Sequence, residues 1–173
     1  MATTIRPEHP DDHAGIEEVN RLAFGQDNEA RLAAKLRQAD GFDPALSLVA
    51  LRDGKVVGHI LFSPIHIETD RGEVPALALA PMAVLPECQQ QGIGSQLVRE
   101  GLEACRRAGY DILVVVGHAE YYSRFGFTTA SRFGIRAPFP VADEAFMALG
   151  LAPHSLDEIS GVVRYPPPFE DVS

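Results

Sequence analysis

The stretch Leu85-Pro86-Glu87-Cys88-Gln89-Gln90-Gln91-Gly92-Ile93-Gly94-Ser95-Gln96-Leu97 determines the fold that we predict. It joins an apolar segment, typical of a buried strand, to a segment whose apolar residues have helical spacing. Two glycines at the junction allow the main chain to approach a bulky anion. The first helical turn presents unpaired N–H groups, and the helix dipole adds positive charge there. We therefore expect a phosphate site formed by Gln89, Gln90, Gln91, Gly92, Ile93, Gly94 and Ser95.

Two other phosphate motifs and one purely structural explanation compete with this interpretation. A glycine pair before a helix also fits simple packing and capping. A Walker loop needs Gly-Lys-Ser/Thr, and the sequence has no such triplet. A dinucleotide turn needs a third glycine where Leu97 stands and an acid at the end of the next strand, whereas Asp111 starts its strand. The two nucleotide motifs do not fit, while capping stays open from the glycines alone.

Strand-like and helix-like segments alternate along the rest of the chain, which predicts a mixed α/β domain. Asp53-Gly54 is a strong hairpin signal between two of the strands. We expect helices over residues 11–24, 28–38, 92–108 and 119–125, and strands over 3–6, 45–51, 55–68, 74–85, 111–116, 133–135, 145–149 and 161–165. The length of 173 residues predicts a single domain, 1–173, with a core over 3–127 and C-terminal strands over 128–173.

Composition and charge exclude several classes of protein. Hydrophobic residues make up 46% of the chain and charged residues 23%, which is typical of a globular domain. The net charge of −9, without a basic stripe, argues against nucleic acid and favours a cationic or amine-bearing partner. The longest apolar stretch, 74–85, is too short for a membrane span. There is no secretory signal, and Cys88 and Cys105 suggest no disulfide framework, so we expect a cytoplasmic protein.

Two motifs resemble one known family. Gln89-x-x-Gly92-x-Gly94 resembles the Q/R-x-x-G-x-G/A motif of the GNAT superfamily of acetyl-CoA-dependent N-acetyltransferases. Tyr121-Tyr122-Ser123-Arg124-Phe125-Gly126-Phe127 resembles the Tyr-x-x-x-Gly-Phe element that follows the fifth strand in many members. The resemblance covers residues 5–127, and the ending Val-Val-Arg-Tyr-Pro-Pro-Pro-Phe is similar to a bacterial branch of predicted N-acetyltransferases. It implies a GNAT fold: a mixed, mostly antiparallel central sheet flanked by helices, with strands four and five splayed.

The resemblance also implies where acetyl-CoA binds. In this family the pantetheine arm lies between the splayed strands, so that main-chain N–H groups of strand four bind it. Mapped onto this chain, these donors belong to Met82, Ala83 and Val84. The N–H of Met82 or Ala83 would polarise the thioester carbonyl. Pro81, just before them, has no N–H to give to a neighbouring strand.

Tyr122 and His118 are the candidate catalytic residues. By resemblance, Tyr122 lies near the sulfur, donates the proton to the leaving thiolate and contacts the cofactor. The base is less defined, because residues 76–83 carry no ionisable side chain where many family members have a glutamate. His118, Glu120, His66, Glu68 and a water chain to solvent are the alternatives. We expect no metal, since the remaining histidines show no ligand spacing.

The predicted function is transfer of an acetyl group from acetyl-CoA to a primary amine by direct attack. The acceptor is an amine-bearing small molecule, a peptide or a protein, and its pocket could include Phe24, Asn28, Phe139 and Phe146. A non-catalytic acyl-CoA-binding or regulatory domain of the same fold is the alternative, while a nucleotide-binding oxidoreductase fits poorly. The family often forms homodimers, but no feature of this sequence decides that point.

Overall fold

The computed structural model describes residues 2–172. These residues divide into two compact units. Unit 1 comprises Met1–Ser63, Ala80–Ala104 and Pro167–Ser173, and unit 2 comprises Pro64–Leu79 and Cys105–Pro166. Strands β3 (Lys55–Thr69) and β4 (Gly72–Val84) contribute to both units. The expectation that 1–173 acts as one N-acetyltransferase domain remains a prediction.

The strands form a mixed, mostly antiparallel sheet, as predicted. Its main path has the order β1-β2-β3-β4-β5-β8-β6, with β9 (Gly161–Arg164) paired to β3 and β7 (Ile135–Arg136) paired to β9. Strands β1 (Thr4–Pro7) and β2 (Ser47–Arg52) are antiparallel, and the predicted Asp53-Gly54 turn leads into β3. The pair β4–β5 is parallel, as is β7–β9, with β5 spanning Ile112–Val116.

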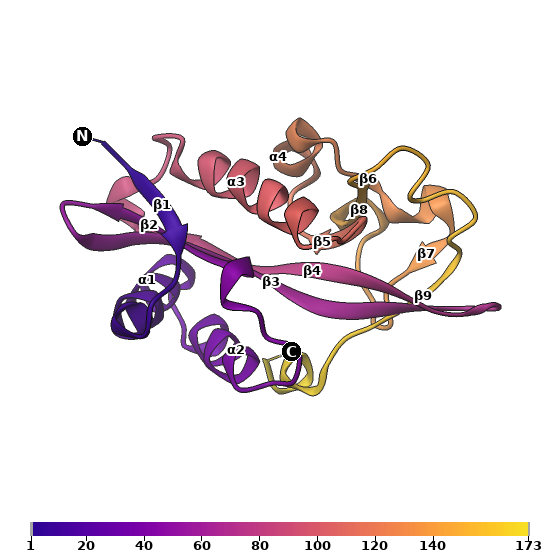
Figure 1. The fold of residues 1–173 in the computed structure, drawn as a ribbon, viewed down its shortest axis with the longest axis horizontal. Helices are drawn as coiled ribbons and strands as arrows, with labels where there is room; N and C mark the ends of the chain where they lie inside the picture. Colours follow the sequence, from indigo (N-terminus) through magenta and orange to yellow (C-terminus); the bar gives the residue numbers. More distant parts are fainter. Residues whose placement is uncertain (1, 173) are drawn as a thin grey trace. The chain divides into compact units, whose positions relative to one another are not determined.

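In unit 1, helices cover both faces of the N-terminal strands. Helices α1 (His13–Phe24) and α2 (Asn28–Arg37) lie on one face, and α3 (Ile93–Arg107) lies on the other (Figure 1). All three were predicted to within a few residues. The cluster Leu32, Ala33, Leu36 and Leu61 packs α2 against β3. No helix within residues 2–172 is long and apolar enough to cross a bilayer.

A β-bulge determines which residues of β3 face the helices on each side of the sheet. The β2–β3 register shifts between Ala50 and Leu51, so that Leu51 pairs with Val56 but Ala50 pairs with Gly58. Gly58 then faces α3, where an added Cβ would come within 3.0 Å of Leu97 and 3.2 Å of Ile93. The absence of a side chain at Gly58 therefore allows α3 to approach the strand closely.

Unit 2 contains the remaining strands and a short helix, α4 (Ala119–Tyr122). Strand β5 pairs with β8 (Phe146–Gly150), which in turn pairs with β6 (Thr128–Thr129). The predicted strand over 133–135 is wrong at its start. Ala130–Phe133 forms a 3-10 helix that ends at Gly134, in the left-handed conformation at φ 77°, and the strand begins only at Ile135.

Candidate active site

The predicted phosphate site forms an open turn at the start of α3. We call Gln89–Ser95 the phosphate turn. Gln90 and Gly92 have positive φ values of 63° and 85°, and a Cβ on Gly92 would meet nothing within 4 Å. The N–H of Gln96 donates to the carbonyl of Gly92 at 3.0 Å. Helix geometry therefore leaves the N–H groups of Ile93 and Gly94 without an acceptor inside α3. The turn can thus bind an anion.

Two glutamine side chains connect the phosphate turn to its surroundings in unit 1. Gln89 Nε2 donates to the carbonyl of Val84 at 3.0 Å, which links the turn to the end of β4. Gln91 Oε1 accepts from Arg52 Nη1 at 2.6 Å, and its Nε2 donates to the carbonyl of Glu87 at 3.3 Å. The turn is therefore attached to β4 and to the β2–β3 hairpin. Ser95, on the first turn of α3, is buried.

Strand β4 carries both the pairing with β5 and the predicted oxyanion donors, at different points along its length. The two strands pair at Leu77 with Leu113 and at Ala78 with Val114, in unit 2. Met82, Ala83 and Val84 are the last residues of β4 and belong to unit 1. The N–H of Leu85 then donates to the carbonyl of Val57 at 2.9 Å, which returns the chain to β3.

Tyr122 belongs to unit 2, where it is almost fully buried. Its ring packs edge-on against Tyr121 and Phe127, with centroid distances of 5.0 and 5.7 Å. An added Cβ on Gly117 would come within 2.5 Å of this ring, so the glycine makes room for it. Burial, and then the neighbouring Tyr121, raise the pKa of Tyr122 to about 12. The phenol therefore stays protonated at neutral pH, as a proton donor must.

The candidate bases lie in several places. His118 precedes α4 and is exposed, as is Glu120 in its first turn. His66 Nε2 lies 3.6 Å from a Glu73 carboxylate oxygen, and Arg164 Nε lies 3.2 Å from Glu68. The two histidine candidates thus differ in their surroundings: His66 lies beside the carboxylate of Glu73, whereas His118 is exposed at the start of α4.

The suggested acceptor residues also fall in different surroundings. Phe24 and Asn28 belong to unit 1, and Asn28 accepts a hydrogen bond from Arg31 at 2.7 Å. Phe139 and Phe146 belong to unit 2, where Phe146 is buried in the core. Phe24 and Phe139 are exposed large apolar side chains. The two exposed phenylalanines remain the better candidates for contact with an acceptor.

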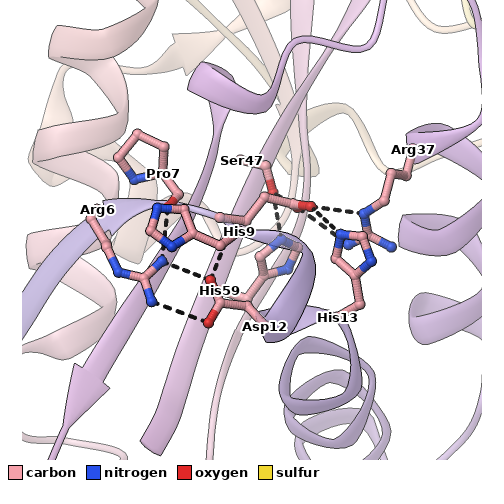
Figure 2. A network of polar contacts seen from close by, with 9 residues as sticks. Arg6, Pro7, His9, Asp12, His13, Arg37, Ser47 and His59 are labelled. Carbon is pink, nitrogen blue, oxygen red and sulfur yellow. Dashed lines mark hydrogen bonds and ion pairs between the residues drawn. The ribbon is translucent and has the colours of Figure 1, made fainter. Parts of the chain in front are cut away.

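A second polar region of unit 1 was not predicted. We call Glu8, His13, Asn20, Arg37, Ser47 and His59 the Glu8 cluster. The Glu8 carboxylate accepts from Arg37 Nε at 2.8 Å and from Ser47, and it lies 2.9 Å from His13 Nε2. Beside it, Arg6 and the main-chain N–H of His9 both bind Asp12, as Figure 2 shows. No motif in the sequence indicated the contacts of Glu8 with Arg37 and Ser47, which lie 29 and 39 residues away.

A directional hydrogen-bond chain runs through this cluster. Asn20 Nδ2 donates to His59 Nδ1 at 3.2 Å, which places the ring proton of His59 on Nε2, 3.0 Å from Ser47 Oγ. Ser47 in turn donates to Glu8. Complete burial lowers the pKa of His59 to about 4, so the ring is neutral. Burial alone would raise the pKa of Glu8, but hydrogen bonds from Arg37 and Ser47 outweigh it and lower the pKa.

Comparisons with known proteins identify relatives of this chain. A model of the acetyltransferase (GNAT) domain matches residues 4–130. The chain is 38% identical over 162 residues to the uncharacterized N-acetyltransferase YhbS of Escherichia coli K12, covering 93% of this chain and 95% of YhbS. The crystal structure of E. coli YhbS in complex with CoA superposes with a TM-score of 0.90 at 37% identity, covering 97% and 92% of the two chains. A GNAT family acetyltransferase from Brucella melitensis in complex with acetyl-CoA has a TM-score of 0.80 at 36% identity, covering 97% and 98%. The chain therefore belongs to the GNAT acetyltransferase family.

Proposed function

We propose that this protein transfers the acetyl group of acetyl-CoA to a primary amine by direct attack. The phosphate turn carries this proposal, because it offers main-chain N–H groups to a diphosphate in a chain whose net charge is −9. The CoA complex of YhbS and the acetyl-CoA complex of the Brucella protein support the same cosubstrate. Gln89–Ser95 would bind the pyrophosphate, and Met82, Ala83 and Val84 the pantetheine arm and thioester.

The main-chain donors of β4 would stabilise the charge that develops on the thioester oxygen. As the amine nitrogen attacks the carbonyl carbon, electrons move onto this oxygen, and the N–H of Met82 or Ala83 binds it. When the intermediate collapses, the C–S bond breaks and the electron pair leaves with the CoA sulfur. Removing one such donor raises the barrier by about 2.7–4 kcal/mol in other enzymes. A main-chain donor also survives side-chain substitution, so it offers no simple variant to test.

Tyr122 would donate the proton to the departing sulfur. Its phenol is protonated at neutral pH because burial raises its pKa to about 12. Replacement of Tyr122 by phenylalanine should lower turnover about 10²–10⁴-fold and leave the affinity for acetyl-CoA nearly unchanged. Tyr121 is the matched control, because its ring packs on Tyr122 and Phe125. Equal turnover of Y122F and Y121F would exclude this role.

His118 is the base that we propose for the proton released by the amine. A neutral imidazole has a ring nitrogen that can accept a proton, which suits a base. The variant H118Q should lower turnover, whereas E120Q should not. The reverse result would assign the base to Glu120, and no effect in either variant would favour water as the proton acceptor.

A non-catalytic acyl-CoA-binding domain is the second candidate function. It is favoured by one observation: residues 76–83 have no ionisable side chain where many relatives carry a glutamate. Release of free thiol from acetyl-CoA, measured with a panel of primary amines, distinguishes the two functions. An enzyme releases thiol in proportion to one of the amines, whereas a binding domain is stabilised by acetyl-CoA against heat and releases none.

A further inference from the structure

Arg52 lies at a rigid position next to the phosphate turn. It is the last residue of β2 and pairs with Lys55 across the Asp53-Gly54 turn. Both turn residues have positive φ values, 52° and 75°, as the tight two-residue hairpin turn requires. The main chain of Arg52 is thus held by the sheet on one side and by a tight turn on the other. The position of its Cα and Cβ atoms is therefore well defined.

The guanidinium of Arg52 connects two segments that are distant in sequence. Its Nε donates to Thr3 Oγ1 at 3.0 Å, and its Nη1 donates to Gln91 Oε1 at 2.6 Å. A planar guanidinium with several donors in a fixed geometry can hold both acceptors at once, which a single ammonium group on a flexible stem does less well. Arg52 therefore connects the segment before β1 to the phosphate turn.

Gln91 lies between the two residues of the turn that have positive φ values. It stands between Gln90 and Gly92, whose φ values are 63° and 85°. A left-handed conformation is unfavourable for a residue with a Cβ, so Gln90 needs support from its surroundings. The hydrogen bond from Arg52 to the neighbouring Gln91 supplies such support. Gln91 also occupies a variable position of the Gln-x-x-Gly-x-Gly motif, where the motif itself assigns no role.

We propose that Arg52 is a positioning residue of the CoA site: by holding Gln91 it keeps the phosphate turn in the conformation that binds the diphosphate. This inference rests on the proposed function. Arg52 reaches the phosphate turn through Gln91, because its Nη1 donates to Gln91 while its Nε donates to Thr3. CoA and a CoA without its 3′-phosphate should therefore depend on Arg52 equally, since both carry the diphosphate.

Isothermal titration of CoA and of 3′-dephospho-CoA tests this proposal with the full chain. We expect R52A to raise the dissociation constant of both ligands by the same factor, about 3- to 10-fold, which is within the range that one typical, exposed hydrogen bond contributes. We expect R52K to behave like R52A, because a lysine keeps the charge but not the planar geometry. R71A is the control, since Arg71 lies in the turn between β3 and β4 and belongs to unit 2.

The variant Q91A completes a double-mutant cycle. If Arg52 acts through Gln91, then R52A/Q91A binds CoA no more weakly than the poorer single variant. Additive losses would overturn the proposal, as would a loss for CoA that dephospho-CoA does not share, or full affinity in R52K. Unchanged affinity in R52A would also overturn it while leaving the proposed function intact. Failure of the wild-type protein to bind CoA would overturn both.

Discussion

The Glu8 cluster and the phosphate turn both belong to unit 1, but their polar groups are arranged in opposite ways. In the cluster, Glu8, Ser47 and His59 are buried and hydrogen-bonded in succession, and the carboxylate of Glu8 accepts from both Arg37 and Ser47. In the turn, the N–H groups of Ile93 and Gly94 have no acceptor inside α3, and an added Cβ on Gly92 would reach nothing within 4 Å. Paired polar groups stabilise a fold, whereas unpaired ones near the surface are free to bind a ligand.

The comparison predicts that substitutions in the two regions have different effects on stability and on CoA binding. Changes in the Glu8 cluster should reduce the free energy of unfolding and leave the affinity of the folded protein for CoA alone. Changes in the phosphate turn should reduce the affinity for CoA, whatever their effect on the free energy of unfolding. One residue departs from this division, since Asn20 Oδ1 is buried without a hydrogen-bond partner within residues 2–172. Its Nδ2 nevertheless donates to the carbonyl of Ile16 at 3.0 Å and to His59.

The largest effect is expected from Glu8→Gln. This substitution keeps the volume of the side chain but leaves the largely buried Arg37, 14% exposed, without its anion. Breaking a buried ion pair in this way costs about 3–5 kcal/mol of stability. Unfolding by urea, followed by circular dichroism, measures the loss. The CoA affinity of the folded fraction at low temperature should match the wild type.

Glu17→Gln is the matched control for Glu8→Gln. Glu17 lies 3.8 Å from Arg21 on the surface of α1, with 65% of its side chain exposed. An exposed pair of this kind contributes at most about 0.5 kcal/mol. If the two glutamine variants were equally stable, the Glu8 cluster would have no special part in holding the fold.

The second effect is a loss of stability in mild acid, caused by His59. In the unfolded chain this histidine takes up a proton near its ordinary pKa of 6.5, whereas in the folded protein burial lowers the pKa to about 4. Its contribution to stability is therefore complete above pH 6.5 and is lost as the pH falls towards 4. The total is about 3 kcal/mol, from 1.36 kcal/mol per pKa unit. Urea unfolding at several pH values measures the slope.

The variant His59→Gln separates this titration from that of the carboxylates. It should have a smaller slope than the wild type between pH 6.5 and 4, whatever its absolute stability. The lowered pKa of Glu8 acts at more acidic pH, because its stabilising effect is lost only as the pH falls through the folded pKa. Equal slopes in the two proteins would mean that His59 is not the group that titrates.

The third effect concerns two glycines that both have positive φ values. Gly92 in the phosphate turn and Gly54 in the β2–β3 hairpin have φ values of 85° and 75°, and neither would bring a Cβ within 4 Å of another atom. Alanine should cost each about 1–2 kcal/mol of stability. Only G92A should also lose CoA affinity, by about tenfold or 1.4 kcal/mol, because its methyl group occupies space that the diphosphate needs. Equal affinity in G92A and G54A would place the diphosphate elsewhere.

Local patterns predicted one of these two regions and not the other. The phosphate turn is contiguous, so glycines, a strand before it and a helix after it were all visible in one stretch. The Glu8 cluster joins Glu8, Ser47 and His59, which lie 39 and 12 residues apart in successive hydrogen bonds. A histidine within an apolar strand gave no signal of its partners. Contacts between distant residues depend on strand register, and a bulge such as that opposite Ala50 changes which face a side chain occupies.

The same reasoning explains the smaller errors. The predicted strand over 133–135 failed because Gly134 ends a 3-10 helix, and helical turns of this length leave no periodicity to detect. Arg52 was not singled out either, since its contact with Gln91 spans 39 residues. The elements α1, α3 and β5 were predicted well, because their apolar residues follow a clear pattern with clear end signals.

The smallest effect is expected from Gln89→Ala, and it sharpens the comparison because the side chain of this motif residue donates a hydrogen bond to the end of β4. Its Nε2 donates to the carbonyl of Val84 at 3.0 Å, so its loss frees the turn from β4 but leaves the main-chain donors intact. A single neutral hydrogen bond contributes about 0.5–1.5 kcal/mol, so the dissociation constant of CoA should rise about two- to tenfold. Gln26→Ala is the control, since the Gln26 amide also donates, to Glu29 at 3.0 Å, but lies in the loop after α1. If Q89A lost more affinity than G92A, the side chain of Gln89 would itself contact the cofactor, and the division between a binding main chain and supporting side chains would not hold.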